Sequence, residues 1–249
     1  MRKSVANGQI QLVPDRFEKI YFNWINNLRD WCISRQIWYG HRIPVWYRAQ
    51  NAAERTQKNA EEIYVGIEPP AGEGWDQDSD TLDTWFSSAL WTFSTLGWPS
   101  FAKASESKPS DLETYHPTSL MNPGYEIIFF WVARMILMSG FLLGSIPFKT
   151  VYFHGILRDA QGRKFSKSLN NGIEPLEVIE QFGTDALRMA LVIGISAGAD
   201  SNFDTNKVKA YKHFSNKIWN AARFVLTNIE GIDFEKETPL TKTDEMILQ

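Results

Sequence analysis

The spacing of hydrophobic and polar positions changes several times along the chain and predicts its elements. Residues 45–47, and the stretches 117–121 and 151–154, have the pattern of short strands, while residues 10–13 form one alternating patch in a polar lead-in over 1–22. Residues 175–182 predict a helix that ends at Gly183, and Thr184 is placed to cap a second helix over 185–193. Because strands and helices alternate from about residue 115 to 193, we expect an α/β fold with a parallel sheet.

Beyond Gly198 the pattern becomes that of a long helix. Apolar residues recur every three or four positions, at Val208, Tyr211, Phe214, Ile218, Ala222, Val225 and Ile229. This spacing lines one face of a helix over about 206–229. This change in the spacing of apolar residues predicts a domain boundary near residue 200.

Residues 127–143 form the most apolar run of the chain. Arg134 lies in the middle of this run, and 17 residues are few for crossing a bilayer. We therefore expect a buried helix and no membrane partner.

Four further stretches have patterns of their own. In the aromatic region 23–47, Asn27 or Asp30 could cap a short helix, and residues 48–60 are rich in helix formers. Residues 61–83 contain eight acidic and no basic residues, so we interpret them as a solvated surface loop rather than a metal site. Residues 100–114 resemble a polar linker.

Composition narrows the classes of protein. Of 249 residues, 43% are hydrophobic, which is enough for a substantial core. The net charge of −3 excludes nucleic-acid binding by bulk charge, so any RNA contact must be local. A single cysteine, Cys32, excludes an internal disulfide framework, and the first residues lack the apolar core of a signal peptide. A cytoplasmic location is expected.

A basic segment carries the clearest chemistry. Residues 158–168 read R-D-A-Q-G-R-K-F-S-K-S, with four cations and two hydroxyls, and follow a predicted strand. Ammonium groups and hydroxyls are suited to binding the oxygens of a polyphosphate, and parallel sheets place ligands after their strands. A solvated basic surface loop is the alternative on spacing alone.

The string K-F-S-K-S at 164–168 is similar to the K-M-S-K-S loop of class I aminoacyl-tRNA synthetases. Four further strings resemble the valyl branch of that family, at residues 30–44, 82–91, 124–135 and 216–226. The resemblance implies a Rossmann-like nucleotide-binding domain, represented by its second half over 1–200, and the start of a helical anticodon-binding domain over 201–249. It also implies activation of valine with ATP and Mg²⁺ and transfer to tRNA(Val).

The same resemblance implies site residues. Lys164 and Lys167 would be catalytic and would hold the ATP phosphates, assisted by Ser166 and Ser168, with Phe165 in place of the usual methionine. His154 and Glu126 would lie near the adenylate, with Glu126 replacing the family's aspartate. Trp85 and Ile127 would line the valine pocket, while Gln36, Trp38 and His41 would support the site.

Two departures from the family pattern change the expectation. The ATP-binding H-I-G-H signature of the family contains an H-x-x-H pair, and this sequence has none. We therefore expect the N-terminal half of the catalytic domain to be missing. We also expect the isolated chain to be nearly inactive. The resemblance begins where the editing insertion of the family ends. No cysteine pair occurs at residues 48–80, so we predict no structural zinc.

The predicted long helix suggests a surface for tRNA. Lys209, Lys212 and Arg223 lie opposite its apolar stripe, with Lys217 nearby, and such cations contact phosphates without reading sequence. A solvated helix face explains the same pattern. Two other functions remain open, namely a non-catalytic RNA- or nucleotide-binding module and a synthetase of the isoleucyl or leucyl branch.

Overall fold

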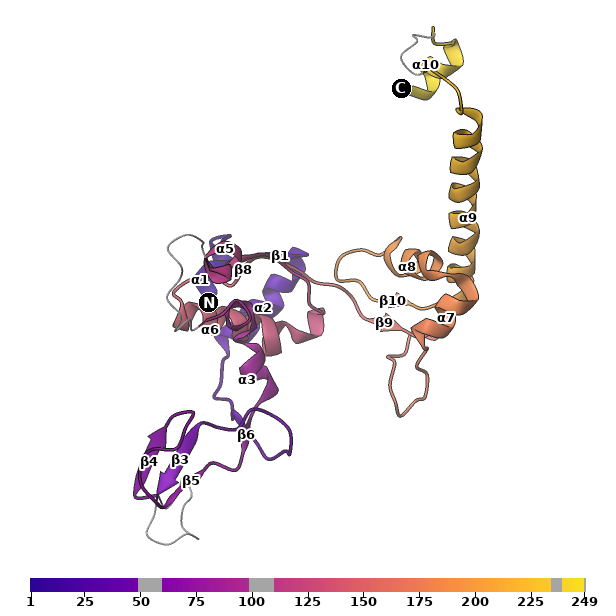
Figure 1. Cartoon of the computed structure of the whole chain (residues 1–249). Coiled ribbons are helices and arrows are strands. Elements are labelled where there is room, and N and C mark those ends of the chain that lie inside the picture. Colours follow the sequence, from indigo (N-terminus) through magenta and orange to yellow (C-terminus); the bar gives the residue numbers. More distant parts are fainter. Residues whose placement is uncertain (49–59, 99–109, 234–238, 249) are drawn as a thin grey trace. The chain divides into compact units, whose positions relative to one another are not determined.

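The computed structural model describes residues 1–48, 60–98, 110–233 and 239–248, in two compact units (Figure 1). Unit 1 consists of Met1–Ile156 and Ser196–Asp200, and unit 2 of Leu157–Ile195 and Ser201–Gln249. Most of the stretch of helix formers at 48–60 and most of the linker expected at 100–114 lie outside the described residues.

A parallel sheet organises unit 1. Its order is β1 (Gln11–Val13), β8 (Phe148–Tyr152) and β7 (Thr118–Met121), with β8 in the centre. Leu12 and Met121 both pair in register with Val151, which is fully buried. The predicted parallel α/β arrangement is confirmed, although β8 begins and ends earlier than the stretch 151–154.

Short helices pack around this sheet. They are α1 (Arg2–Ala6), the 3₁₀ turn η1 (Asp15–Phe17), α2 (Glu18–Asn26) and α5 (Asp111–Tyr115), and Ser110 and Glu113 form a capping box on α5. Tyr21 of α2 and Phe17 of η1 are buried in the same cluster as Val151. The expected helix start at Asn27 or Asp30 is wrong, because α2 already ends at Asn26 and the chain then continues without helix to Ile33.

The apolar run forms a composite helix. A 3₁₀ turn, η3 (Tyr125–Ile127), leads into a π-helical segment, η4 (Ile128–Ala133), and then into α6 (Arg134–Leu142). Tyr125–Leu142 is long and apolar enough to cross a membrane by length and composition, a property that core helices share. Val132 and Met135 are fully buried in the cluster that contains the sheet. The helix is thus built into the core of unit 1, as expected.

The acidic region is exposed over most of its length, as expected, but it contains strands as well as loop. It forms β4 (Glu62–Val65) and β5 (Trp75–Gln77), which pair antiparallel with the two edges of β3 (Val45–Arg48). β6 (Thr81–Leu82) pairs with β2 (Ser34–Arg35). Tyr64 contacts Trp75 edge to face with ring centroids 6.3 Å apart, and Arg48 lies over the Trp75 ring. Aromatic cross-strand contacts therefore order a segment whose charge pattern favoured a loop.

Unit 2 begins with the basic segment. β9 (Leu157–Arg158) pairs in parallel with β10 (Ser201–Asn202), and helices α7 (Pro175–Phe182) and α8 (Thr184–Val192) lie between them in sequence. The predicted bounds of α7 are confirmed, with Pro175 in its first turn and Gly183 at φ +92°. Thr184 does not cap α8, because it already belongs to the helix.

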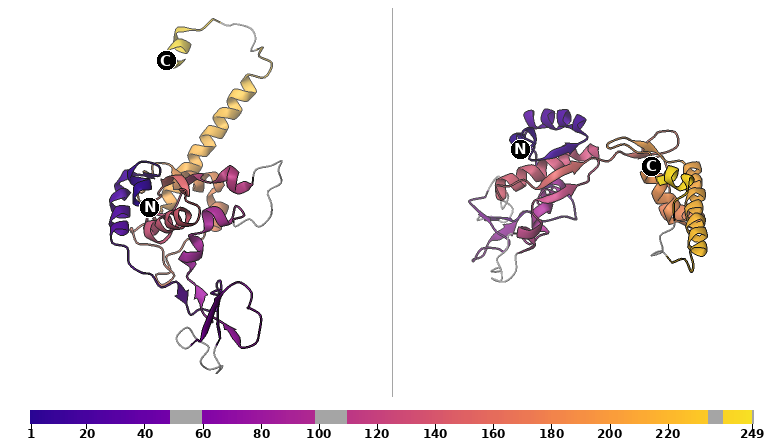
Figure 2. Two further views of the ribbon diagram at one scale, coloured as in Figure 1. Left: turned by 90° about the vertical axis from the view of Figure 1, so that its left-hand side faces the viewer. Right: turned by 90° about the horizontal axis from the view of Figure 1, so that it is seen from above.

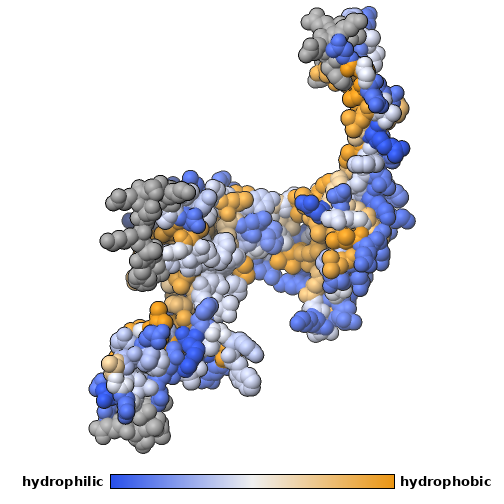
Figure 3. All heavy atoms as spheres, in the orientation of Figure 1, coloured by the Kyte–Doolittle hydropathy of each residue, from blue (hydrophilic) through white to orange (hydrophobic). Residues whose placement is uncertain are grey.

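The long helix α9 (Thr205–Asn228) follows, and α10 (Lys242–Leu248) is the last element. α9 packs on α8 (Figure 2). Its Val208 is fully buried. Farther along the predicted stripe, Phe214, Ile218 and Val225 are 46–53% exposed. Orange apolar atoms accordingly appear along the part of α9 beyond α8 in Figure 3.

Candidate functional site

The carboxyl ends of two parallel strands place Glu126 and His154 at one edge of the sheet in unit 1. β7 ends at Met121 and β8 at Tyr152. Just beyond, Gly124 and His154 form a further parallel bridge, and the backbone N–H of Tyr125 donates to the His154 carbonyl at 3.3 Å. Glu126 and His154 are both exposed there. Parallel sheets place their ligands at this edge.

A second chain segment closes on the strand ends. Gly198 N–H donates to the Phe153 carbonyl at 2.8 Å, and a side chain at position 155 would collide with the backbone of Ala199, so Gly155 permits this approach. Asp200 accepts from the Ile156 backbone N–H at 2.8 Å and from the Tyr125 hydroxyl at 3.2 Å. Sequence reasoning missed Asp200, because its partners lie 44 and 75 positions away.

Trp85 and Ile127 lie on neighbouring helical elements. Trp85 belongs to α3 (Thr84–Ser88), and its ring centroid is 5.5 Å from that of Phe130 in η4. Ile127 is the last residue of η3, directly before η4. Both side chains are half-buried, which suits the wall of an apolar pocket better than a closed core.

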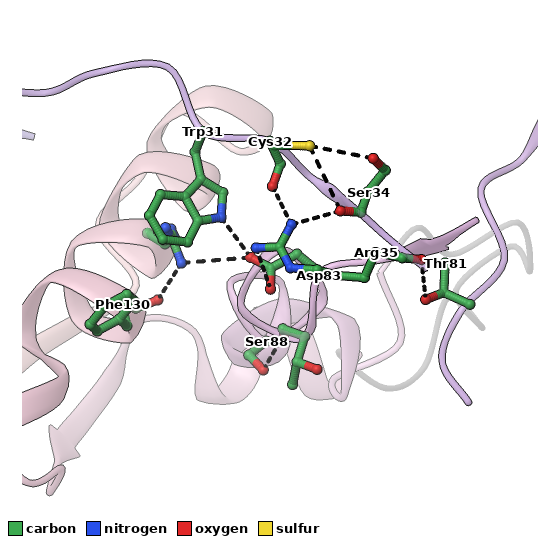
Figure 4. Close-up of polar contacts among 10 residues, drawn as sticks. Trp31, Cys32, Ser34, Arg35, Thr81, Asp83, Ser88 and Phe130 are labelled. Atoms are coloured by element: carbon green, nitrogen blue, oxygen red, sulfur yellow. Dashed lines mark hydrogen bonds and ion pairs between the residues drawn. The ribbon is translucent and has the colours of Figure 1, made fainter. Parts of the chain in front are cut away.

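A buried ionic network holds the start of α3 (Figure 4). Asp83 precedes the helix and accepts from Trp31 Nε1 at 2.8 Å. Its carboxylate also pairs with Arg35 at 3.2 Å and Arg134 at 3.9 Å, and the Asp83 side chain is only 7% exposed. The Arg134 guanidinium lies 4.4 Å from the Trp31 ring centroid, and burial lowers its pKa. Asp83 thereby fixes the helix that carries Trp85.

Trp131, which sequence reasoning missed, also ties η4 to α3. Its Nε1 donates to the Ser88 carbonyl at 3.0 Å. The spacing of four residues from Ile127 was the available signal, because such positions share a helix face. Of the proposed supporting residues, His41 contacts the Ser87 hydroxyl at 3.1 Å, whereas Trp38 is 95% exposed.

In unit 2, the basic segment is an ordered hairpin rather than an open loop. Arg158 and Lys164 form an antiparallel bridge, and Gly162 turns the chain at φ +78°. Arg163 Nε pairs with Asp159 at 2.7 Å, so part of the positive charge in the segment is already neutralised. Lys164 and Lys167 are exposed on this hairpin and the turn that follows it.

The hydroxyls and the aromatic residue of the motif have defined contacts. Ser166 Oγ lies 2.8 Å from Ser168 Oγ and accepts from the Leu169 N–H at 3.2 Å. Phe165 packs against the buried cluster of unit 2 and lines an apolar cavity of about 260 Å³ with Leu157, Val178 and Phe203 among its walls. Phe165 thus anchors the segment between the two lysines.

Asp159 is the acidic residue of this hairpin, and the pKa of its carboxyl is lowered. The residue is 5% exposed, and hydrogen bonds from Asn171 and Arg163 lower its pKa to about 2. A carboxylate with such partners stays ionised throughout the physiological range. It stabilises the hairpin and supplies no proton to a reaction near neutral pH.

The site residues predicted from sequence fall into two groups. Trp85, Glu126, Ile127 and His154 belong to unit 1, and residues 164–168 belong to unit 2. Within the described residues, no group of three or more His, Cys, Asp and Glu side chains is arranged to hold a metal ion.

The cations expected to face tRNA differ from one another. Lys209 and Arg223 are exposed on α9. Lys212, in contrast, donates from Nζ to the Gln181 carbonyl at 2.9 Å and lies 5.9 Å from the Phe182 ring centroid. Lys212 therefore helps to fasten α9 to α7.

Comparison with known families agrees with the fold and the motifs. The model of tRNA synthetases class I (I, L, M and V) matches residues 1–204. The chain belongs to this family.

Curated relatives specify the branch that the sequence resembles. The chain is 54% identical over 231 residues to a valine–tRNA ligase of Anoxybacillus flavithermus, and 50% identical over 229 residues to that of Bacillus subtilis. These alignments cover 92% of the chain but only 25% and 24% of the relatives. The chain therefore spans about a quarter of the length of the curated relatives it matches.

Solved structures share the fold at low sequence identity. Mycobacterium tuberculosis methionyl-tRNA synthetase in complex with methionyl-adenylate matches 99% of this chain and 42% of its own, with a TM-score of 0.67 and 18% identity. A LeuRS–tRNA–LeuAMS complex from Agrobacterium radiobacter K84 matches 89% of this chain and 32% of its own, with a TM-score of 0.65 and 22% identity. Both support the class I catalytic fold.

Proposed function

We propose that this chain forms part of a valine–tRNA ligase and supplies its phosphate-binding loop and part of its valine pocket. The observation that carries the proposal is the ordered Lys164–Lys167 segment after β9, in a chain 50–54% identical to valine–tRNA ligases. The neighbouring isoleucyl and leucyl branches share the family, but the highest-identity relatives reported above are valine enzymes.

In the proposed reaction, a valine carboxylate oxygen attacks the α-phosphorus of ATP. A new P–O bond forms, the bond from the α-phosphorus to the bridging oxygen breaks, and pyrophosphate leaves. Lys164 and Lys167 stabilise the negative charge that grows on the pyrophosphate, with Ser166 and Ser168 as nearby donors. Ammonium groups that act on developing charge stabilise the transition state more than the ground state, and so they lower the barrier. The tRNA hydroxyl then attacks the carbonyl carbon of the adenylate and AMP leaves.

For the adenylate, we propose His154 and Glu126 as the partners from unit 1. Both lie at the carboxyl edge of the sheet, where hydroxyls and amines of a nucleotide find hydrogen-bond partners. Trp85 and Ile127 would provide apolar walls for the valine side chain. Because one methylene contributes only about 1–3 kcal/mol to discrimination, such walls must be rigid, and the Asp83 network supplies that rigidity for Trp85.

Mg²⁺ would arrive with ATP under this proposal. Magnesium is commonly bound by substrate phosphates and few carboxylates. When bound, it neutralises phosphate charge. We also propose a cytoplasmic location, where tRNA and ATP are both available.

We further propose that residues 201–249 begin a helical anticodon-binding domain. α9 begins at Thr205, shortly after β10 ends at Asn202, and presents Lys209 and Arg223 to solvent. These cations would contact tRNA phosphates.

The test is a chimera in which residues 1–249 replace the matching quarter of the Bacillus subtilis relative. We expect ATP–pyrophosphate exchange that depends on valine and responds about 100-fold less to isoleucine or leucine, the order of selectivity that one methylene allows. The parent enzyme and a chimera with Lys164→Ala and Lys167→Ala are the controls.

Other outcomes would redirect the assignment. Exchange driven by isoleucine or leucine would move the chain to another branch. A folded chimera that binds tRNA but exchanges pyrophosphate with no amino acid would favour a non-catalytic binding module. The isolated chain is expected to show little exchange. The family's ATP-binding H-I-G-H signature contains an H-x-x-H pair, and this sequence has none.

A further inference from the structure

One side-chain amide connects three separate points of the basic hairpin. Asn171 Nδ2 donates to Asp159 Oδ2 at 3.0 Å and to the Lys164 carbonyl at 3.1 Å. Asn171 Oδ1 accepts from the Ser166 backbone N–H at 2.9 Å. The amide therefore holds the main chain on both sides of Phe165.

Asp159 anchors the other end of this connection. Its Oδ1 accepts from the backbone N–H groups of Gln161 at 3.0 Å and Arg163 at 2.8 Å, and its Oδ2 accepts from Arg163 Nε as well as from Asn171. Four donors thus converge on one carboxylate in a residue that is 5% exposed. Hydrogen bonds to a buried charge are among the stronger ones, and removing their acceptor leaves several groups unsatisfied.

We propose that Asp159 and Asn171 are positioning residues that fix Lys164 and Lys167 relative to each other for pyrophosphate departure. The inference rests on the function proposed above. Asn171 acts directly on the backbone of Lys164 and Ser166, and Lys167 follows Ser166 at once. In this role Asn171 and Asp159 act through the backbone of the motif and not by contact with substrate.

The expected effect is on the chemical step. Misplacing a charged group by about 1 Å can cost on the order of 100-fold in rate. The Asn171→Ala chimera should lose about 10- to 100-fold in kcat of pyrophosphate exchange while the KM for valine stays within about twofold, since the proposed valine pocket belongs to unit 1. Gln161→Ala is the matched control, because it keeps the backbone N–H that donates to Asp159 and removes only an exposed side-chain amide, which has a long 3.4 Å contact with Arg163 Nη2.

A charge exchange tests the pairing itself. Asn171→Asp alone places a second carboxylate against that of Asp159, where the side chains are now 3.0 Å apart. Because like charges repel at this distance, it should lower kcat more than Asn171→Ala. Adding Asp159→Asn removes one of the two facing charges, so the double variant should be more active than Asn171→Asp, while the lost contacts with the Lys164 carbonyl and Arg163 Nε keep it below the unmodified chimera. Such non-additivity is the signature of residues in direct contact. Two independent structural defects would instead add, making the double variant the less active.

Hydrogen exchange on the chain itself covers the case in which a variant chimera misfolds. In the unmodified chain, the Ser166 amide should be protected from exchange, and Asn171→Ala should remove that protection while amides of α7 keep theirs. Unchanged Ser166 exchange, unchanged kcat or additive single effects would each overturn the inference. An unmodified chimera without any exchange activity would instead refute the proposed function, and so the two failures are distinguishable.

Discussion

The indole nitrogen of Trp31 donates to Asp83 Oδ2 at 2.8 Å, across 52 positions of sequence. Arg35 and Arg134 meet the same carboxylate from two further elements. This carboxylate therefore joins the segment after α2, strand β2 and helix α6 at the start of α3, which carries Trp85.

Asp83→Ala should destabilise unit 1 by about 2–4 kcal/mol, because it leaves the Arg134 guanidinium, 13% exposed, without its carboxylate. Urea unfolding followed by tryptophan fluorescence measures the change. Glu62→Ala is the control, since the Arg48–Glu62 pair is 45% and 59% exposed and its loss should cost less than about 1 kcal/mol. Equal effects of the two substitutions would show that the Asp83 network does not stabilise the unit.

Phe165→Ala should loosen the segment between the two lysines, because the ring packs on the cluster of unit 2. Limited trypsin digestion of the chain should then cleave after Lys164 and Lys167 at least about fivefold faster than in the unmodified chain. Phe165→Met conserves most of the apolar volume and should stay within about twofold. Equal cleavage rates in all three proteins would contradict the anchoring role.

The pKa of Asp159 provides a test by titration. Hydrogen bonds from Asn171 and Arg163 lower it to about 2 in the folded chain, below the ordinary value of 3.8. Asp159 thus contributes stability that is complete above about pH 4 and is lost as the pH falls through about 2. NMR of the Asp159 carboxyl carbon should give a midpoint near 2, and Asn171→Ala should move it upward. A midpoint near 4 in the unmodified chain would contradict these contacts.

The salt dependence of tRNA binding distinguishes Lys209 from Lys212 on α9. If Lys209 contacts a tRNA phosphate, Lys209→Ala should reduce the slope of log Kobs against log salt by about 0.7–0.9. Lys212 is engaged with the Gln181 carbonyl, so Lys212→Ala should change the slope little and lower the thermal stability of unit 2. Filter binding of tRNA over a salt series measures the slopes of both variants, and thermal unfolding measures the stability of the Lys212 variant. Identical slopes for the Lys209 variant and the unmodified chain would remove Lys209 from the interface.

Local sequence signals predicted local structure well. Pro175 and Gly183 marked the ends of α7, and the strand pattern at 117–121 found β7 to within one residue. Contacts between distant residues could not be predicted this way. The β4–β3–β5 sheet depends on Trp46, Tyr64 and Trp75 meeting across strands, while the acidic charges around them favoured a loop.

The candidate site shows the same division. The motif at 164–168 selected the lysines, and the string at 124–135 selected Glu126 and Ile127. Asp200 and the Asp159–Asn171 pair had no signal of spacing, because their partners meet only when the strand ends and the hairpin fold. The apolar stripe of α9 predicted a helix face correctly, but Val208 alone among its seven members is fully buried.

The most direct test of the central claim is the rate of valine-dependent ATP–pyrophosphate exchange by the chimera with and without Lys167. We predict that Lys167→Ala lowers kcat about 100- to 1,000-fold, as expected for loss of one charge-stabilising group, with the KM for valine nearly unchanged. Gln161→Ala, on the same hairpin, should remain near the unmodified rate. A Lys167→Ala chimera that exchanges pyrophosphate as fast as the unmodified one would contradict the assignment of this segment to the phosphates.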